Sequence, residues 1–190
     1  MFDVLRQTLA QRRRRTLVRP KAAAVLVPII DDGDPRRLLL TRRTNHLPTH
    51  KGQVAFPGGR LENDETPIEA ALREAHEEIG LPASHVEVLG LLDDFPTIHN
   101  DTTVTPVVAR IANLPPLTPE PGEVARIFDI PLSILLASES WRIDTVRHQK
   151  RQWPMYYCDH DGETLWGLSA YITLHMLDQS PLSMPFEFAS

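Results

Sequence analysis

The stretch from Gly58 to Leu81, GGRLENDETPIEAALREAHEEIGL, constrains this chain more than any other because it places seven carboxylates and two arginines within one predicted loop and helix. Thr66 suits the N-cap of the helix and Pro67 suits its first position. Glu69, three residues after Thr66, completes a capping box. Gly80 is typical of a helix end. A short helix with defined ends is therefore predicted.

This predicted helix has two faces of different chemistry. One face is apolar and consists of Ile68, Leu72, Ala75 and Ile79. A separate face groups Glu74, Glu77 and Glu78 in the last two turns, where the helix dipole and mutual repulsion disfavour negative charge. A hard divalent cation such as Mg²⁺ takes carboxylate oxygens and would offset that cost. The spacing therefore predicts a cation site.

The length and composition favour one globular unit. With 190 residues and 42% hydrophobic content, the chain can bury one sizeable core, so we expect a single domain over residues 1–190. The single cysteine, Cys158, excludes an internal disulfide framework and fits a reducing compartment. The longest apolar run, residues 22–30, is too short to span a bilayer, and the N-terminus lacks a signal-peptide core. We expect a cytoplasmic protein with no membrane partner.

The formal net charge of −5 is unevenly distributed along the chain. Residues 1–21 carry seven Lys/Arg against Asp3, a net charge of +6, so the remainder carries −11. Nucleic acid is therefore not expected as a partner. Arg12–Arg15 are interpreted as the solvated face of a basic N-terminal arm or helix, with attraction of an anionic ligand as the alternative.

The rest of the chain mixes expected strands and helices. Strands are expected in AAAVLVPII and RRLLLT, joined as a hairpin by DDGDP, and in VEVLGLLDD, TVTPVVARI, SWRIDTVR and QWPMYYC. Helices are expected at residues 3–18, in PLSILLA and in GLSAYITLHMLDQ. NLPPLTPEPG is expected as an exposed connection, and THKGQVAFPGG as a sharp turn that can approach a ligand. An α/β fold class follows.

The acidic stretch matches the Nudix box at every charged position. The matching residues are Gly59, Glu65, Arg73, Glu74, Ala75, Glu77, Glu78, Gly80 and Leu81. The chain thus resembles the Nudix hydrolases, which mostly hydrolyse diphosphates attached to another moiety. The resemblance implies a Nudix-type α/β/α sandwich with a mixed β-sheet and a loop–helix–loop catalytic motif.

The resemblance also implies roles for individual residues. Glu74, Glu77 and Glu78 are implied as ligands of Mg²⁺ or Mn²⁺, with Glu77 and Glu78 among the catalytic residues. Glu65 and Arg73 are implied as an ion pair that braces the loop. Divalent ions suit the reaction because they neutralise a pyrophosphate, orient it and lower the pKa of bound water.

The base that activates the water is expected to be Glu78 or a carboxylate outside the box. Glu120 and Glu123, in TPEPGEVARIF, are candidates because family members often draw a further acidic residue from a loop. No proton-transfer role is assigned to His50, His76 or His99.

A second resemblance narrows the substrate. Residues 39–59, LLTRRTNHLPTHKGQVAFPGG, look like the upstream motif of coenzyme A pyrophosphatases within the same superfamily. Two positions depart from that motif: Thr44 replaces a small Ser or Ala, and Pro48 replaces an Arg. The matched glycines and the nearby cations are the candidate substrate-binding residues: Gly58, Gly59, Arg42, Arg43 and Lys51. LWGLSAYI, residues 165–172, resembles a later segment of that group, with Trp166 expected as a core aromatic.

The sequence therefore predicts a metal-dependent hydrolase that cleaves coenzyme A or its derivatives to 3′,5′-ADP and the corresponding 4′-phosphopantetheine. Another nucleoside diphosphate derivative, such as ADP-ribose, a dinucleotide or a dinucleoside polyphosphate, is the alternative substrate. A non-catalytic Nudix binding module is the non-enzymatic alternative.

Overall fold

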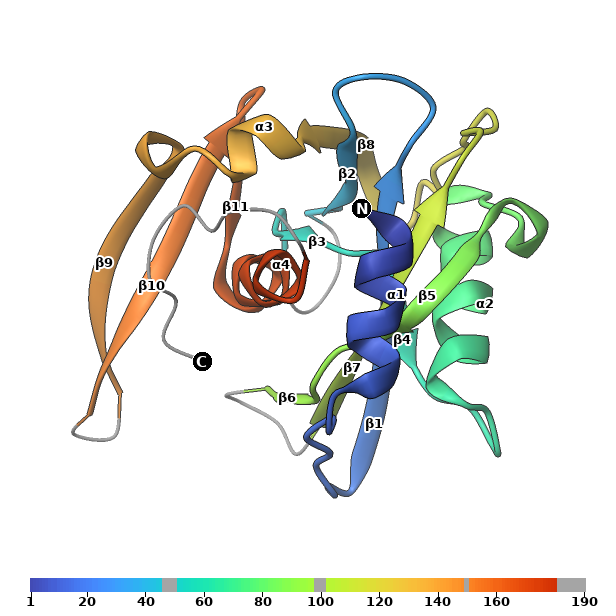
Figure 1. Ribbon diagram of the computed structural model, residues 1–190, viewed down its shortest axis with the longest axis horizontal. Helices are drawn as coiled ribbons and strands as arrows, with labels where there is room; N and C mark the ends of the chain where they lie inside the picture. Colours follow the sequence, from blue (N-terminus) through green and yellow to red (C-terminus); the bar gives the residue numbers. More distant parts are fainter. Residues whose placement is uncertain (46–50, 98–101, 149–150, 181–190) are drawn as a thin grey trace.

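The expected strands and helices assemble around a mixed β-sheet in the computed structural model, which describes residues 1–45, 51–97, 102–148 and 151–180 (Figure 1). The helices are α1 (Phe2–Gln11), α2 (Pro67–Ile79), α3 (Leu132–Leu135) and α4 (Gly167–Asp178), with 3-10 turns η1 (Ala83–His85) and η2 (Ser138–Ser140). The strands are β1 (Lys21–Ile30), β2 (Arg37–Arg43), β3 (Val54–Ala55), β4 (Gly58–Arg60), β5 (Glu87–Leu91), β6 (Phe95–Pro96), β7 (Thr102–Ile111), β8 (Val124–Pro131), β9 (Trp141–His148), β10 (Arg151–His160) and β11 (Glu163–Trp166).

Strand β1 is apolar along most of its length because both of its faces are covered. Alternate side chains of a strand point to opposite faces of the sheet. Leu26 and Ile30 belong to the buried cluster that includes the apolar side of α2. Val27 and Ile29 belong to the cluster that includes α1 and α4. The two cores thus lie on opposite faces of one strand.

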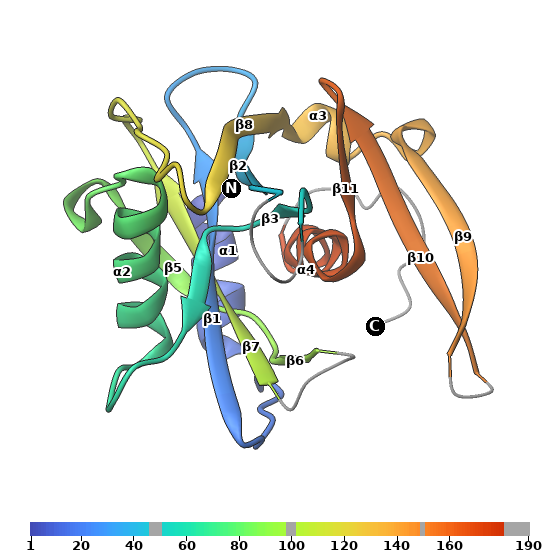
Figure 2. The ribbon, with the colours of Figure 1, turned by 180° about the vertical axis from the view of Figure 1, so that it is seen from behind.

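The main sheet runs in the order β3-β2-β1-β7-β5, with β4 paired to β1, β6 to β7 and β8 to β2. Strands β1 and β7 are parallel and the other pairs are antiparallel, so the sheet is mixed. Helices α1 and α2 lie on opposite faces of this sheet (Figures 1 and 2). The expected α/β/α sandwich with a mixed sheet is therefore confirmed.

A second, antiparallel sheet of order β11-β10-β9 touches the main sheet where β11 meets β3, and α4 lies between the two sheets (Figure 2). Helix α4 is buried along most of its length, which explains its largely apolar sequence. The side chain of Trp141 and that of Tyr156 join the same core from this second sheet. None of the helices in the described ranges is long and apolar enough to cross a membrane.

The N-terminal segment differs from its prediction. The helix expected over residues 3–18 ends with α1, and the backbone is extended from Arg12. Arg12 NH2 lies 2.8 Å from Asp93 Oδ1, and the guanidinium of Arg14 pairs with Asp94. The interpretation of these two arginines as solvated is therefore wrong. Extended backbone suits the alternate spacing of Arg12 and Arg14, which both reach the acidic pair after β5.

Strands β3, β4, β6, β8 and β11 are absent from the sequence-based prediction. Strand β8 lies beside β2 and pairs along its whole length, although its sequence VARIFDIP lacks a regular alternation of apolar and polar residues.

Trp166, expected in the core, is 36% exposed and stacks beside Tyr157, with ring centroids 6.3 Å apart. It is the last residue of β11 and lies on the sheet face opposite the buried Leu165, which is why it remains near the surface.

Candidate active site

Helix α2 has the ends predicted for it. The hydroxyl of Thr66 accepts a hydrogen bond from the backbone N–H of Glu69, and the Glu69 carboxylate accepts one from the backbone N–H of Thr66. Gly80 ends the helix in the left-handed conformation, at φ 67°. This capping box and glycine set the register in which the last two turns present their carboxylates.

The three glutamates of α2 do not share one environment, and this corrects the prediction of a separate acidic face. Glu78 is 4% exposed and lies among the buried residues of the helix, Glu74 is partly buried, and the Glu77 side chain is 58% exposed. Glu78 lies one helical turn from Ala75 and two from Ala71, both fully buried. Its carboxylate therefore enters the protein beside the apolar stripe.

Glu78 is held by backbone and by one cation. Its Oε2 accepts a hydrogen bond of 3.1 Å from the backbone N–H of Gly58, and its Oε1 lies 3.6 Å from NH1 of Arg43. Burial nevertheless raises the pKa of Glu78 to about 7, because desolvation of the charged form outweighs both of these interactions. An additional positive charge at this carboxylate would stabilise its ionised form.

The glycines before α2 allow this close approach. A Cβ on Gly58 would overlap the carbonyl oxygen of Ala24 on β1, and a Cβ on Gly59 would overlap the carboxylate of Glu74. Strand β4 pairs with β1 at these positions, so its backbone cannot move away. A side chain is thus excluded at Gly58 by the backbone of β1, whereas a side chain at Gly59 would displace the carboxylate of Glu74.

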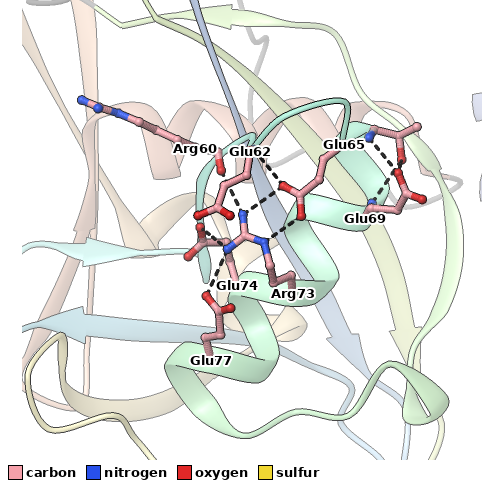
Figure 3. Close-up of polar contacts among 8 residues, drawn as sticks. Arg60, Glu62, Glu65, Glu69, Arg73, Glu74 and Glu77 are labelled. Carbon is pink, nitrogen blue, oxygen red and sulfur yellow. Dashed lines mark hydrogen bonds and ion pairs between the residues drawn. The ribbon is translucent and has the colours of Figure 1, made fainter.

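Arg73 is the centre of a charged cluster on the exposed side of α2 (Figure 3). Its Nε lies 2.8 Å from Oε1 of Glu65 and its NH2 lies 3.0 Å from Oε2, a bidentate pair. Its NH1 donates to Glu74 at 2.9 Å and to Glu77 at 3.0 Å, and its NH2 also donates to the carbonyl of Arg60. The pairing with Arg73 lowers the pKa of Glu65. The guanidinium thus joins the loop to the acidic helix.

The loop after β7 brings Glu120 and Glu123 to different positions. The Glu120 carboxylate accepts hydrogen bonds from the backbone N–H groups of Gly122 and Glu123, so it caps its own turn. The negative charge of Glu123 contributes to the raised pKa values of Glu74 and Glu78, after desolvation and the larger contacts. Glu123 therefore shares the electrostatic environment of α2 more closely than Glu120 does.

The three basic side chains predicted to bind substrate lie in different surroundings. Arg43 reaches Glu78, whereas NH1 of Arg42 lies 3.4 Å from Glu163 Oε1 on the second sheet. Neighbouring residues of a strand point to opposite faces, and a bulge between Arg42 and Arg43 adjusts the register with β8. Lys51 is exposed. Pro48, with His50 and His99, lies outside the described residues.

The acidic residues fit a hard divalent cation by their chemistry. Burial raises the pKa of Glu74 as well as that of Glu78, and neighbouring carboxylates add to both shifts. Within the described ranges, no three acidic, histidine or cysteine side chains are gathered closely enough to hold a metal ion. Arg73 instead holds Glu74 and Glu77, so these carboxylates would have to turn from Arg73 toward the ion.

A mixed sheet between helices, with a capped acidic helix packed against strand β4, gives the protein the α/β/α-sandwich architecture of Nudix-type proteins. A model of the NUDIX domain matches residues 20–148, and the chain belongs to the Nudix hydrolase family. Members of this family generally depend on divalent metal ions.

The sequences of other Nudix hydrolases align with most of this chain. An uncharacterized Nudix hydrolase, NudL, of Yersinia pestis is 39% identical over 160 residues, which cover 84% of this chain and 79% of the relative. NudL of Yersinia pseudotuberculosis matches to the same extent. The crystal structure of RenU, a Nudix hydrolase from M. smegmatis, has a TM-score of 0.51 and 29% identity, covering 59% of this chain and 71% of its own.

A further solved structure matches the fold alone. The MutT/nudix family protein from Enterococcus faecalis is 18% identical, with a TM-score of 0.52 over 83% of this chain and 54% of that protein. These likenesses support the sandwich architecture and leave the substrate of this chain open.

Proposed function

We propose that this protein hydrolyses the diphosphate bond of coenzyme A or its derivatives in a reaction that depends on Mg²⁺ or Mn²⁺. The products are 3′,5′-ADP and the corresponding 4′-phosphopantetheine. The observation that carries the proposal is the contact between Arg43, from the segment that resembles coenzyme A pyrophosphatases, and Glu78 of the acidic helix. The contact brings together residues of the two motifs from which the substrate and the reaction class are inferred.

In this proposal Glu74, Glu77 and Glu78 hold the divalent ion, which neutralises the diphosphate and lowers the pKa of bound water. Glu65 keeps Arg73 in place, and Arg73 orients Glu74 and Glu77 until the ion binds. The exposed side chain of Glu77 can turn at little cost in packing. The three carboxylates thus differ in exposure, and Glu77 has the most room to turn toward the ion.

Arg43 is the proposed contact to a substrate phosphate. Its Nε is buried without a hydrogen-bond partner, and its NH1 lies 3.6 Å from Glu78, which is longer than a hydrogen bond. A substrate phosphate would offer acceptors to this guanidinium, because guanidinium groups form strong charge-assisted hydrogen bonds with phosphate. Arg42 is already paired with Glu163, so it is no longer favoured for this role. Gly58 and Gly59 are proposed to let the substrate approach the backbone, because neither carries a side chain that would cover it.

The water is proposed to lose its proton to Glu123 or to Glu78. Glu120 is less favoured because its carboxylate already accepts two backbone hydrogen bonds within its own turn. Glu123 lies on an exposed part of the same turn, where its carboxylate can reach solvent.

Residues 1–190 are proposed to act as one domain, because α1, α4 and the second sheet share a core cluster.

The test is an incubation of the purified protein with coenzyme A and either Mg²⁺ or Mn²⁺, followed by identification of the products. We expect 3′,5′-ADP and 4′-phosphopantetheine, and loss of at least about 100-fold in turnover in Glu77→Gln. A panel with ADP-ribose, a dinucleotide and a dinucleoside polyphosphate runs in parallel. Rapid cleavage of one of these, with coenzyme A untouched, would reject the proposed substrate.

Hydrolysis of another nucleoside diphosphate derivative is the second candidate function. It is favoured by Pro48, which replaces the cation of the coenzyme A motif and so removes a possible contact to the 3′-phosphate. The same panel distinguishes the two. Binding of a panel member without turnover by the wild type would instead indicate a non-catalytic module.

A further inference from the structure

The turn that carries Glu123 is attached to the acidic helix at one side. The backbone N–H of Glu120 donates to the carbonyl of Glu78 at 2.8 Å, and that of Thr118 donates to the carbonyl of Ile79 at 3.0 Å. The last carbonyls of a helix lack partners within the helix, so these bonds satisfy the end of α2. Residues 118–120 are thus fixed to α2, ahead of Glu123.

The other side of the turn is attached to the end of β2 through Thr44. The backbone N–H of Thr44 donates to the carbonyl of Glu123 at 2.9 Å, and its hydroxyl donates to the carbonyl of Gly122 at 3.0 Å. Thr44 is 6% exposed, so water cannot easily replace the hydroxyl. It follows Arg43, the residue that contacts Glu78.

We propose that Thr44 is a positioning residue whose hydroxyl holds the Gly122–Glu123 turn so that the Glu123 carboxylate faces the acidic helix. The inference rests on the proposed function, because it assigns Thr44 to the same hydrolytic site. The Glu123 charge also acts on Glu74 and Glu78, which supports this placement.

Substitution of Thr44 can remove the hydrogen bond from its hydroxyl to Gly122 while keeping the one from its backbone N–H to Glu123. Thr44→Val has nearly the same shape but no hydroxyl, and it leaves the Gly122 carbonyl without its side-chain donor. Thr44→Ser retains the hydroxyl and loses only a methyl group. Both variants keep the backbone N–H that donates to Glu123. A difference between them therefore reports on the hydroxyl.

The first measurement is the kinetics of four variants: Thr44→Val, Thr44→Ser, Glu123→Gln and the double variant Thr44→Val/Glu123→Gln. Loss of one buried hydrogen bond predicts about a fivefold lower kcat for Thr44→Val, with KM changed less than about twofold. Thr44→Ser should stay within about twofold of the wild type. In the Glu123→Gln background, Thr44→Val should add less than about twofold, because both changes act through one carboxylate.

The second measurement needs no turnover. Amide hydrogen exchange of Glu123 and Val124, whose N–H groups donate to the Glu120 carbonyl, reports the opening of the turn. We expect exchange about fivefold faster in Thr44→Val and unchanged in Thr44→Ser, with the amides inside α2 unaffected in both.

The outcomes separate this inference from the proposed function. Unchanged exchange in Thr44→Val, or additive losses of kcat in the double variant, would overturn the role of Thr44 while leaving hydrolysis intact. A wild-type protein that cleaves nothing on the panel would reject the proposed function. In that case, the role of Thr44 in hydrolysis falls with it. Faster exchange would then support only the hold of Thr44 on the turn, and unchanged exchange would reject that hold as well.

Discussion

The backbone N–H of Gly58 donates a 3.1 Å hydrogen bond to Oε2 of Glu78, and this bond joins strand β4 to the buried carboxylate of α2. The donor belongs to β4 and the acceptor to α2, 20 residues later. Each of the two segments is constrained by the other, because β4 is also paired to β1.

We predict that Gly58→Ala destabilises the protein by about 1–3 kcal/mol and abolishes most turnover. The added Cβ would overlap the carbonyl of Ala24 and the backbone of Val25, so β4 would have to shift away from Glu78. Chemical unfolding and the hydrolysis assay measure the two effects. Gly33→Ala is the matched control, because a Cβ at Gly33 meets no atom within 4 Å. Equal effects of the two substitutions would contradict this explanation.

We predict that Glu78→Gln makes the metal-free protein more stable at alkaline pH. Burial raises the folded-state pKa of Glu78 to about 7 from the unfolded value of 4.5, so the fold favours the neutral carboxyl. The wild type therefore loses stability as the pH rises through this interval, by up to about 3 kcal/mol above pH 7. Because Arg43 loses its partner, we expect a net gain of about 1–2 kcal/mol in Glu78→Gln at pH 8 in the presence of a chelator.

The measurement is urea unfolding of both proteins with EDTA at pH 5 and pH 8. The difference between them should be small at pH 5 and positive for the variant at pH 8. Added Mn²⁺ should then stabilise the wild type and have little effect on the variant. A variant that is less stable than the wild type at pH 8 without metal would refute the assignment of this buried charge.

We predict that Arg43 and Arg42 differ in function although they are neighbours. Arg43→Gln should raise the KM for the diphosphate substrate by about 10-fold or more, because it removes the cation beside Glu78. Arg42→Gln should leave KM within about threefold and lower the stability instead. The Glu163 side chain is 6% exposed, and without Arg42 its remaining ion-pair partner among the described residues is Arg126. Steady-state kinetics and thermal unfolding measure both variants. Equal KM values for the two would argue against a substrate contact at Arg43.

We predict that His175 contributes to acid sensitivity. Burial lowers the folded-state pKa of His175 below its ordinary value of 6.5, against the opposing charges of Asp93 and Asp178, while Arg12 and Arg15 lower it further. The neutral ring is favoured in the fold, so stability is full above pH 6.5 and falls as the pH drops through the lowered pKa. In His175→Gln, unfolding should depend less on pH between 7 and 5. A pH dependence identical to that of the wild type would contradict the prediction.

Much of the local structure could be predicted from the sequence. The capping box of Thr66 and Glu69, the glycine end of α2 and the apolar strand β1 all depend on residues close to one another in the chain. Strand β8 was harder to predict because its apolar pattern is irregular and its pairing partner, β2, is distant in sequence. Strand β11 is short, so it carries little apolar pattern of its own. Pairing with a neighbour can impose a strand on a weak local pattern.

The sequence by itself determined the spacing of the carboxylates, the ends of their helix and the family of hydrolases, because these follow from local periodicity and from motif order. Only the tertiary structure decided that Glu78 is buried while Glu77 is exposed, and that Arg43 faces Glu78 while Arg42 faces Glu163. It also decided that Arg12 pairs with Asp93. Burial and charge pairing depend on which distant segments pack together, and local spacing does not encode that packing.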